Sequence, residues 1–334
     1  MSTNLFAWLL SAVVLAPNLP GAESAIKLPD DIELVRDVKF GEGGQRPLKM
    51  IILRPKQAPK DPMPVIVYIF GGGWRSGNPD QGIVPLTRFA QRGYFCASID
   101  YRLSQEALFP AQIEDCKCAI RFLRAKAKEY NLDPDHIGVW GPSAGGHLAA
   151  LLGTTGDVKE LEGNGGWAEY SSRVNAVVDW FGPTDFLKMD AAGSKLKHDL
   201  ATSLESRLIG GPIQNNPKKV AKANPITYVS SNDPPFLIMH GDKDPLVPLN
   251  QSELLVDALK KAKVPVQFEI IPNAGHGFWG PVVDGLVDRF FDEHLKGDQP
   301  LKEPDAHAAV IPKPANGQPS LAGPPGPPIT GKQE

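Results

Sequence analysis

Cysteine is scarce in this chain, and the few that occur form no disulfide or metal pattern. Only Cys96, Cys116 and Cys118 are present in 334 residues, and an odd count of this size is no disulfide framework. Neither a CxxC nor an HExxH pattern occurs, so we expect no metal site. Cys96 lies in an apolar run, and the other two lie on a predicted helix. We therefore expect all three to be packing residues.

The chain also lacks an excess of positive charge. It has 35 Lys and Arg against 38 Asp and Glu, a formal net charge of -3, and no long basic run. Binding to phosphates requires clustered Lys and Arg, so nucleic acid is not an expected partner. Hydrophobic residues make up 42% of the chain, enough for the core of one large domain.

No apolar run is long enough to span a bilayer. The run from Leu5 to Ala16 has the length of a signal-peptide core instead, so residues 1–24 are a predicted signal peptide, with cleavage after Ala22 or Ser24. Its first residues, MSTN, lack the usual Lys or Arg, and a retained anchor or a buried terminal helix is the alternative. We expect a secreted or periplasmic protein with no stable membrane partner.

Eight short strand-like runs dominate the next part of the chain, and amphipathic segments separate most of them. This alternation predicts the α/β class: a mostly parallel eight-stranded sheet, opened by a hairpin and covered by helices on both faces. Residues 25–296 form the predicted domain, and the polar segment 186–226 within it is a possible small cap. Residues 297–334 are rich in Pro and Gly and form a predicted disordered tail. The predicted strands are 32–40, 48–55, 65–70, 95–101, 137–141, 174–181, 236–241 and 266–272, and the predicted helices are 111–130, 145–155, 249–262 and 282–295.

A serine stands at a sharp predicted turn between a strand and a helix. Gly141, Ser143 and Gly145 form a G-x-S-x-G pattern in the stretch IGVWGPSAGGHLAALL. Small neighbours on both sides allow a tight, strained turn that projects the serine hydroxyl above the sheet. This context indicates a nucleophile.

A serine nucleophile needs a histidine base, and the chain has seven histidines. His276 follows the last predicted strand in the glycine-flanked loop NAGHGF, so it is the expected base. His147 is too close to Ser143 in sequence to turn back on it and is expected to pack. His240 ends a strand. His198 is expected in a loop or on the surface, as are the other three.

The base in turn needs a carboxylate, which in this chain order falls between the serine and the histidine. The stretch FLIMHGDKDPLVP offers Asp242 and Asp244. Asp244 is preferred because the following proline biases it to an extended or turn conformation, and Asp242 is expected to brace the same loop. Asp185, after another strand, is a third candidate.

Three consecutive glycines follow the strand VYIF. Attack of a serine on an acyl carbonyl creates an oxyanion, which is stabilised by preorganised N–H donors. Backbone amides without side chains can approach such an oxygen closely. We assign the donors to Gly72, Gly73 and Ala144, the residue after the nucleophile.

The ordered motifs FGGGW, DYRL, GPSAGG, HGDKDPLVP and GHGF resemble those of α/β-hydrolase esterases with an HGGG-type oxyanion loop, of the hormone-sensitive-lipase-like and acetylxylan or feruloyl esterase-like branches. The resemblance covers about residues 34–295. It implies that Ser143, Asp244 and His276 form the triad and that the three assigned amides form the oxyanion hole. Phe70 stands where the family has histidine, so the loop loses a polar anchor.

The resemblance implies a serine carboxylesterase that needs no cofactor. The expected substrate is a short-chain acyl ester, small or linked to a polysaccharide, such as an acetyl or feruloyl ester. Alternatives are an amide or peptide hydrolase, arylformamidase-like or prolyl-peptidase-like, and a non-catalytic binding protein. No residue pattern indicates an oligomeric state. The aromatic residues near the insertion line a pocket or form ordinary surface: Trp74, Trp167, Tyr170 and Trp279.

Overall fold

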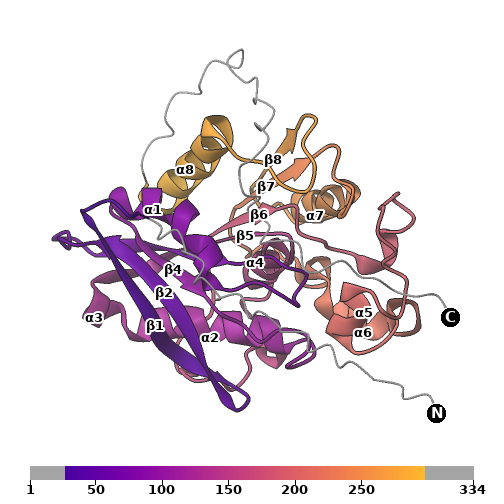
Figure 1. Ribbon diagram of the computed structural model, residues 1–334, viewed down its shortest axis with the longest axis horizontal. Helices are drawn as coiled ribbons and strands as arrows, with labels where there is room; N and C mark the ends of the chain where they lie inside the picture. The colour runs from indigo at the N-terminus through magenta and orange to yellow at the C-terminus, as the bar shows by residue number, and fades with distance from the viewer. Residues whose placement is uncertain (1–26, 298–334) are drawn as a thin grey trace, which may run out of the picture.

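The computed structural model describes residues 27–297, and Figure 1 shows their arrangement. The predicted signal peptide and all but the first residue of the predicted tail lie outside this range. A single eight-stranded sheet crosses the molecule in the order β1-β2-β4-β3-β5-β6-β7-β8. The strands are β1 Ile32–Gly43, β2 Arg46–Pro55, β3 Met63–Ile69, β4 Phe95–Ile99, β5 Leu132–Pro142, β6 Ala176–Trp180, β7 Phe236–Gly241 and β8 Val266–Ile271.

The sheet is mostly parallel, as the apolar runs predict. β1 and β2 form the expected antiparallel hairpin, and β2 also pairs with β4 in an antiparallel sense. From β4 to β8 every pairing is parallel, so each connection must cross a face of the sheet. The carboxyl ends of β3, β5, β6 and β7 therefore meet at one edge, which is where ligands bind in sheets of this kind.

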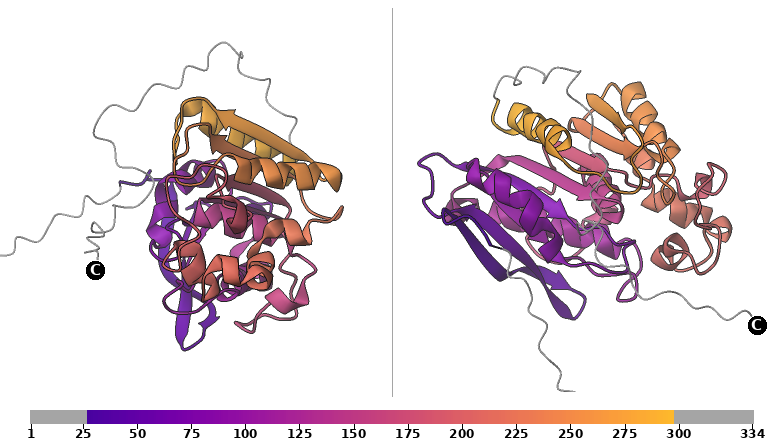
Figure 2. Two further views of the ribbon diagram at one scale, coloured as in Figure 1. Left: turned by 90° about the vertical axis from the view of Figure 1, so that its right-hand side faces the viewer. Right: turned by 45° about the horizontal axis from the view of Figure 1, so that its top comes forward.

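Helices cover both faces of the sheet (Figures 1 and 2). α1 and α8 pack on one face, and α2, α4 and α7 pack on the other. The predicted helix 111–130 is divided at Lys126 into α2 and α3, and α1 was not predicted. The longer helices are α1 Ile83–Gln91, α2 Ala111–Ala125, α4 Ala144–Thr154, α7 Asn250–Lys261 and α8 Pro281–Leu295, with the short α3 at Ala127–Tyr130.

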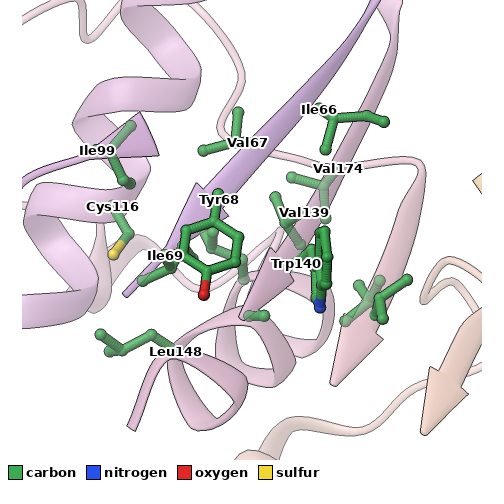
Figure 3. Packing of buried hydrophobic residues seen from close by; sticks show 14 of the residues in the cluster. Ile66, Val67, Tyr68, Ile69, Ile99, Cys116, Val139, Trp140, Leu148 and Val174 are labelled. Carbon is green, nitrogen blue, oxygen red and sulfur yellow. The ribbon is translucent and has the colours of Figure 1, made fainter. Parts of the chain in front are cut away.

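The core lies between the sheet and these helices (Figure 3). The central strand β3 is almost wholly buried, which explains why its sequence MPVIVYI is a continuous apolar run rather than an alternating one. The three cysteines are buried and free, as expected of packing residues. Among residues 27–297 no helix is long and apolar enough to cross a membrane.

The segment 186–226 contains only short helices. They are η3 Phe186–Lys188, α5 Leu204–Ile209, η4 Ile213–Asn215, α6 Pro217–Ala223 and η5 Pro225–Tyr228, the last ending just beyond the segment. Their inner side chains, such as Phe186 and Leu208, are fully buried, so the segment is packed onto the domain. It contributes to the wall of a cavity that is described below.

Candidate active site

Ser143 lies at the turn between β5 and α4, in the strained conformation that the G-x-S-x-G pattern predicts. Its φ of 54° and ψ of -122° fall in a region that non-glycine residues rarely adopt. Gly145 makes the turn possible, because a Cβ there would lie 2.0 Å from the carbonyl oxygen of Ile69. The turn therefore requires glycine, and it exposes the hydroxyl of Ser143 at the carboxyl edge of the sheet.

His276 reaches Ser143 from the loop after β8. Its Nε2 is 2.9 Å from Ser143 Oγ, although 133 residues separate the two in sequence. The ring also lies 4.6 Å, between centroids, from the ring of Phe181, which covers one of its sides. The serine and histidine expected from the sequence are thus in hydrogen-bond contact.

Asp244 completes the arrangement from the loop after β7. Its Oδ2 is 2.7 Å from His276 Nδ1, and its Oδ1 accepts hydrogen bonds from the amides of Leu246 (2.8 Å) and Val247 (3.0 Å). Burial raises the pKa of Asp244, but hydrogen bonds from His240 and His276 together with the backbone amides outweigh it, and the pKa lies well below its usual range. Asp244 is therefore an anion at neutral pH.

The two other candidate carboxylates have different partners. Asp242 is exposed, and its Oδ1 accepts a hydrogen bond from the amide of Asn273 at 2.6 Å, so it braces the loop as expected. Asp185 caps the short helix η3 by accepting from the amide of Leu187. Neither contacts His276.

The predicted oxyanion donors border the same space. Gly72 and Gly73 have φ of 128° and 60°, conformations that favour glycine. Within residues 27–297, their amides donate no hydrogen bond to another group. Ala144 is the first residue of α4, where helix amides have no intrahelical partner. These three amides are therefore available to an oxygen beside Ser143.

Aromatic packing anchors the glycine loop in place of a histidine. Phe70 is buried and stacks on Tyr101, with ring centroids 4.2 Å apart. The hydroxyl of Tyr101 also donates to the carbonyl of Phe70 at 3.1 Å, and the amide of Ser104 donates to the carbonyl of Trp74 at 2.7 Å. The polar anchor lost at Phe70 is thus supplied from the neighbouring segment.

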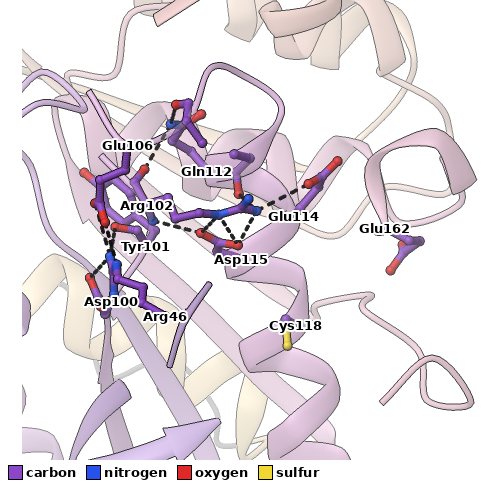
Figure 4. A network of polar contacts seen from close by, with 12 residues as sticks. Arg46, Asp100, Tyr101, Arg102, Glu106, Gln112, Glu114, Asp115, Cys118 and Glu162 are labelled. Carbon is purple, nitrogen blue, oxygen red and sulfur yellow. Dashed lines mark hydrogen bonds and ion pairs between the residues drawn. The ribbon is translucent and has the colours of Figure 1, made fainter. Parts of the chain in front are cut away.

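That segment contains the DYRL motif, and ion pairs fix it (Figure 4). Asp100 pairs with Arg46 on β2, and Arg102 makes a bidentate contact with Asp115 on α2. The sequence alone indicates no role for this motif. The structure shows that its charged residues hold Tyr101 under the glycine loop.

A cavity of about 820 Å³ opens onto Ser143. Of the four aromatic residues singled out in the sequence, Trp74 and Trp279 line it. Trp167 instead donates to the carbonyl of Phe40 at 2.8 Å, on β1, and neither Trp167 nor Tyr170 lines the cavity. The wall includes Gly72, Gly73, Trp74, Ser143, Ala144, Trp180, Phe181, Leu196, His198, Leu204, Glu205, His276, Phe278 and Trp279.

Three other histidines, His147, His240 and His198, are buried near the site. His147 is buried and accepts from Trp74 Nε1 at 3.2 Å, and burial lowers its pKa to about 4. His240 contacts Ser252 Oγ at 2.7 Å and lies 3.4 Å from Asp244 Oδ2, a second neighbour that the sequence did not suggest. His198 lies in a loop, one of the places expected for it, but it is buried in the cavity wall. Ser194 and Glu205 contact it from the same segment, and the carbonyl of Leu246 contacts it from the loop after β7.

The strand-to-helix serine, the following aspartate and histidine, and the mostly parallel sheet together define an α/β hydrolase. Among residues 27–297, no cluster of three or more His, Cys, Asp or Glu side chains is arranged to hold a metal ion. The chain belongs to the BD-FAE family, whose model matches residues 50–259.

Relatives of this chain include esterases and carbohydrate esterases. It is 32% identical to "Esterase LipQ" of Mycobacterium tuberculosis over 80% of this chain and 62% of that protein. A solved "Bifunctional GH43-CE" of Bacteroides eggerthii is similar with a TM-score of 0.72 and 36% identity, over 78% of this chain and 38% of that one. A "Truncated form of carbohydrate esterase from gut microbiota" is similar with a TM-score of 0.71 and 33% identity, over 80% and 99%. The chain thus spans about three fifths of the length of its curated relative.

Proposed function

We propose that this protein is a serine carboxylesterase that hydrolyses short-chain acyl esters through an acyl-enzyme. The observation that carries the proposal is the pair of contacts from His276, at 2.9 Å to Ser143 Oγ and 2.7 Å to Asp244 Oδ2. The nucleophile and the base line one cavity, and the orienting carboxylate is in hydrogen-bond contact with the base from outside that cavity. Relatives named as esterases support the same reaction.

In the proposed acylation step, Ser143 Oγ attacks the ester carbonyl while His276 Nε2 takes the hydroxyl proton. The carbonyl oxygen becomes an oxyanion and accepts hydrogen bonds from the amides of Gly72, Gly73 and Ala144. The tetrahedral intermediate then collapses. The bond to the alcohol oxygen breaks, the alcohol receives the proton from His276, and the acyl group stays on Ser143.

In the proposed deacylation step, His276 takes a proton from a water molecule that attacks the acyl carbonyl. Collapse of the second intermediate returns the proton to Ser143 Oγ and releases the acid. Asp244 stays ionised, holds the proton of His276 on Nδ1 and stabilises the imidazolium that forms twice per turnover.

The proposed substrates are acetyl or feruloyl esters of a polysaccharide or of a small alcohol. The similarity to solved carbohydrate esterases supports this class. The cavity is large enough for more than a bare acetyl group, and Trp279, which is partly exposed in its wall, offers an aromatic surface to a sugar or aromatic ring.

We also propose that the protein is exported by its predicted signal peptide, residues 1–24. The apolar run Leu5–Ala16, which has the length of a signal-peptide core, supports this. Sequencing the amino terminus of the mature protein tests it. A new terminus at Glu23 or Ala25 is expected, and an intact Met1 would contradict export by cleavage.

The test of the activity is hydrolysis of p-nitrophenyl acetate, butyrate and octanoate by the full chain and by Ser143→Ala. Rapid turnover of the short esters is expected, with loss of turnover in the variant by at least about 10³-fold. An unchanged rate in the variant would refute Ser143 as the nucleophile. Failure of the folded wild type to cleave any ester, with cleavage of anilides instead, would identify an amidase.

A further inference from the structure

A buried histidine–glutamate pair lines the cavity, and the proposed chemistry does not use it. His198 and Glu205 both come from the segment 186–226. Their side chains are only 4% and 5% exposed, and His198 Nδ1 is 3.0 Å from Glu205 Oε1. The cavity that they line is the one that contains Ser143.

The hydrogen bonds of His198 define its protonation. Nδ1 faces the carboxylate of Glu205, and Nε2 faces the carbonyl of Leu246 at 3.1 Å and Ser194 Oγ at 2.8 Å. The hydroxyl of Ser194 itself donates to the carbonyl of Leu246, so its oxygen accepts from the ring. Burial lowers the pKa of His198, but Glu205, the Leu246 carbonyl and Asp190 outweigh burial and raise it. Both ring nitrogens therefore face hydrogen-bond acceptors, an arrangement that favours the doubly protonated ring.

One oxygen of this pair has no partner. Glu205 Oε2 is buried and accepts no hydrogen bond within the described part of the chain, residues 27–297. A buried carboxylate oxygen without a donor is costly, and a ligand that supplies the donor removes that cost. Because His198 Nδ1 already contacts Oε1, the remaining oxygen needs one more donor, and a neutral hydroxyl of a ligand supplies one.

Glu205 and His198 lie next to two loops of the active site. Its neighbour Leu204 packs against the glycine loop so closely that a Cβ on Gly73 would lie 2.5 Å from Leu204 Cδ1. On the other side, Leu246, which accepts from His198, is two residues beyond Asp244. The pair thus connects the loop of the predicted oxyanion donors with the loop of the carboxylate.

We propose that Glu205 is a specificity-determining residue that accepts a hydrogen bond from a hydroxyl group of the substrate ester. The hydroxyl belongs either to the alcohol portion, as in a partly acylated sugar, or to the acyl portion, as in a hydroxycinnamate. His198 is a positioning residue that holds Oε1 and leaves Oε2 for the substrate. This inference rests on the proposed esterase function.

Two pairs of esters that differ by one hydroxyl test the inference with the full chain. The alcohol side is tested by 2-hydroxycyclohexyl acetate against cyclohexyl acetate, and the acyl side by methyl 4-hydroxycinnamate against methyl cinnamate. In Glu205→Gln, kcat/KM for the hydroxylated member of one pair is expected to fall about 10- to 100-fold, with the other member within about twofold. The pair of esters whose kcat/KM ratio changes in the variant shows whether the hydroxyl belongs to the alcohol portion or to the acyl portion. Glu253→Gln, on the exposed face of α7, is the control and should change neither ratio.

Several outcomes would overturn the inference. Equal loss on both members of each pair would show that Glu205 only supports the fold, and unchanged ratios would show that it has no role in selection. If Glu205→Gln does not fold, the same two pairs of esters are measured with the wild type. Equal kcat/KM values for the two members of each pair would then show that the site contains no acceptor for a substrate hydroxyl. Hydrolysis of p-nitrophenyl acetate without any hydroxyl preference overturns this inference alone, whereas failure to cleave any ester overturns the proposed function and this inference with it.

Discussion

Replacing Asp244 with asparagine is expected to abolish most activity by reversing the tautomer of His276. Oδ1 of Asp244 accepts from two backbone amides, those of Leu246 and Val247, so an amide nitrogen cannot occupy that position. The asparagine NH₂ must then take the place of Oδ2 and donate to His276 Nδ1. The proton of His276 moves to Nε2, which would donate to Ser143 instead of accepting its proton.

The magnitude follows from the loss of the base. A histidine held in the wrong tautomer lowers kcat by about 10³- to 10⁴-fold, or about 4 to 5.5 kcal/mol of activation free energy. The assay is the burst of p-nitrophenol from p-nitrophenyl acetate, because the burst reports acylation of Ser143 directly. KM is expected to change little, since Asp244 is fully buried and does not line the cavity.

Asp242→Asn is the matched control in the same loop. Its side chain is exposed, and the asparagine oxygen can still accept from the amide of Asn273, so a rate within about twofold of wild type is expected. More than about a tenth of the wild-type activity in Asp244→Asn, combined with a large loss in Asp242→Asn, would refute the assignment of the carboxylate.

Three further substitutions test the supports of the site. Gly145→Ala places a Cβ 2.0 Å from a backbone carbonyl oxygen, so we expect the free energy of unfolding, measured by urea denaturation, to fall by about 3 kcal/mol or more. Gly285→Ala in α8 is the control and should not destabilise the protein, because the nearest atom to the new Cβ lies at 3.4 Å. Tyr101→Phe leaves the carbonyl of Phe70 without its donor and should cost about 1 kcal/mol and lower kcat; full activity would contradict its role as the loop anchor. Burial lowers the pKa of His147 to about 4, so the unfolded chain binds a proton first as the pH falls. Wild-type stability should therefore decline by about 3 kcal/mol relative to His147→Gln between pH 6.5 and pH 4, and parallel stability curves would contradict this.

The parts of the site with a local signal were predictable. Ser143 stands between glycines that the turn requires, and this can be read from a few adjacent residues. His276 is distinguished by its glycine-flanked position after the last strand. Six near-continuous apolar runs likewise predict β3 to β8, which pair in parallel, and the two runs before them predict the β1–β2 hairpin.

The parts that depend on distant contacts were not predictable. His198 looks like a surface residue in a polar segment, and only its contacts with Glu205 and Leu246 reveal that it is buried. Phe70 looks like the loss of an anchor until Tyr101, from the next strand connection, stacks on it. The proline after Asp244 favours it over Asp242 in the sequence, but the contact of Asp244 with His276 is seen only in the fold.

The most direct test of the central claim is to identify the residue that becomes covalently modified. The full chain is treated with a fluorophosphonate, which reacts with activated serine nucleophiles, and the labelled peptide is sequenced by mass spectrometry. A single label on Ser143 is expected, and it should be lost in His276→Ala, since the hydroxyl is unreactive without its base. Labelling of another residue, or equal labelling of Ser143 without His276, would contradict the proposed mechanism.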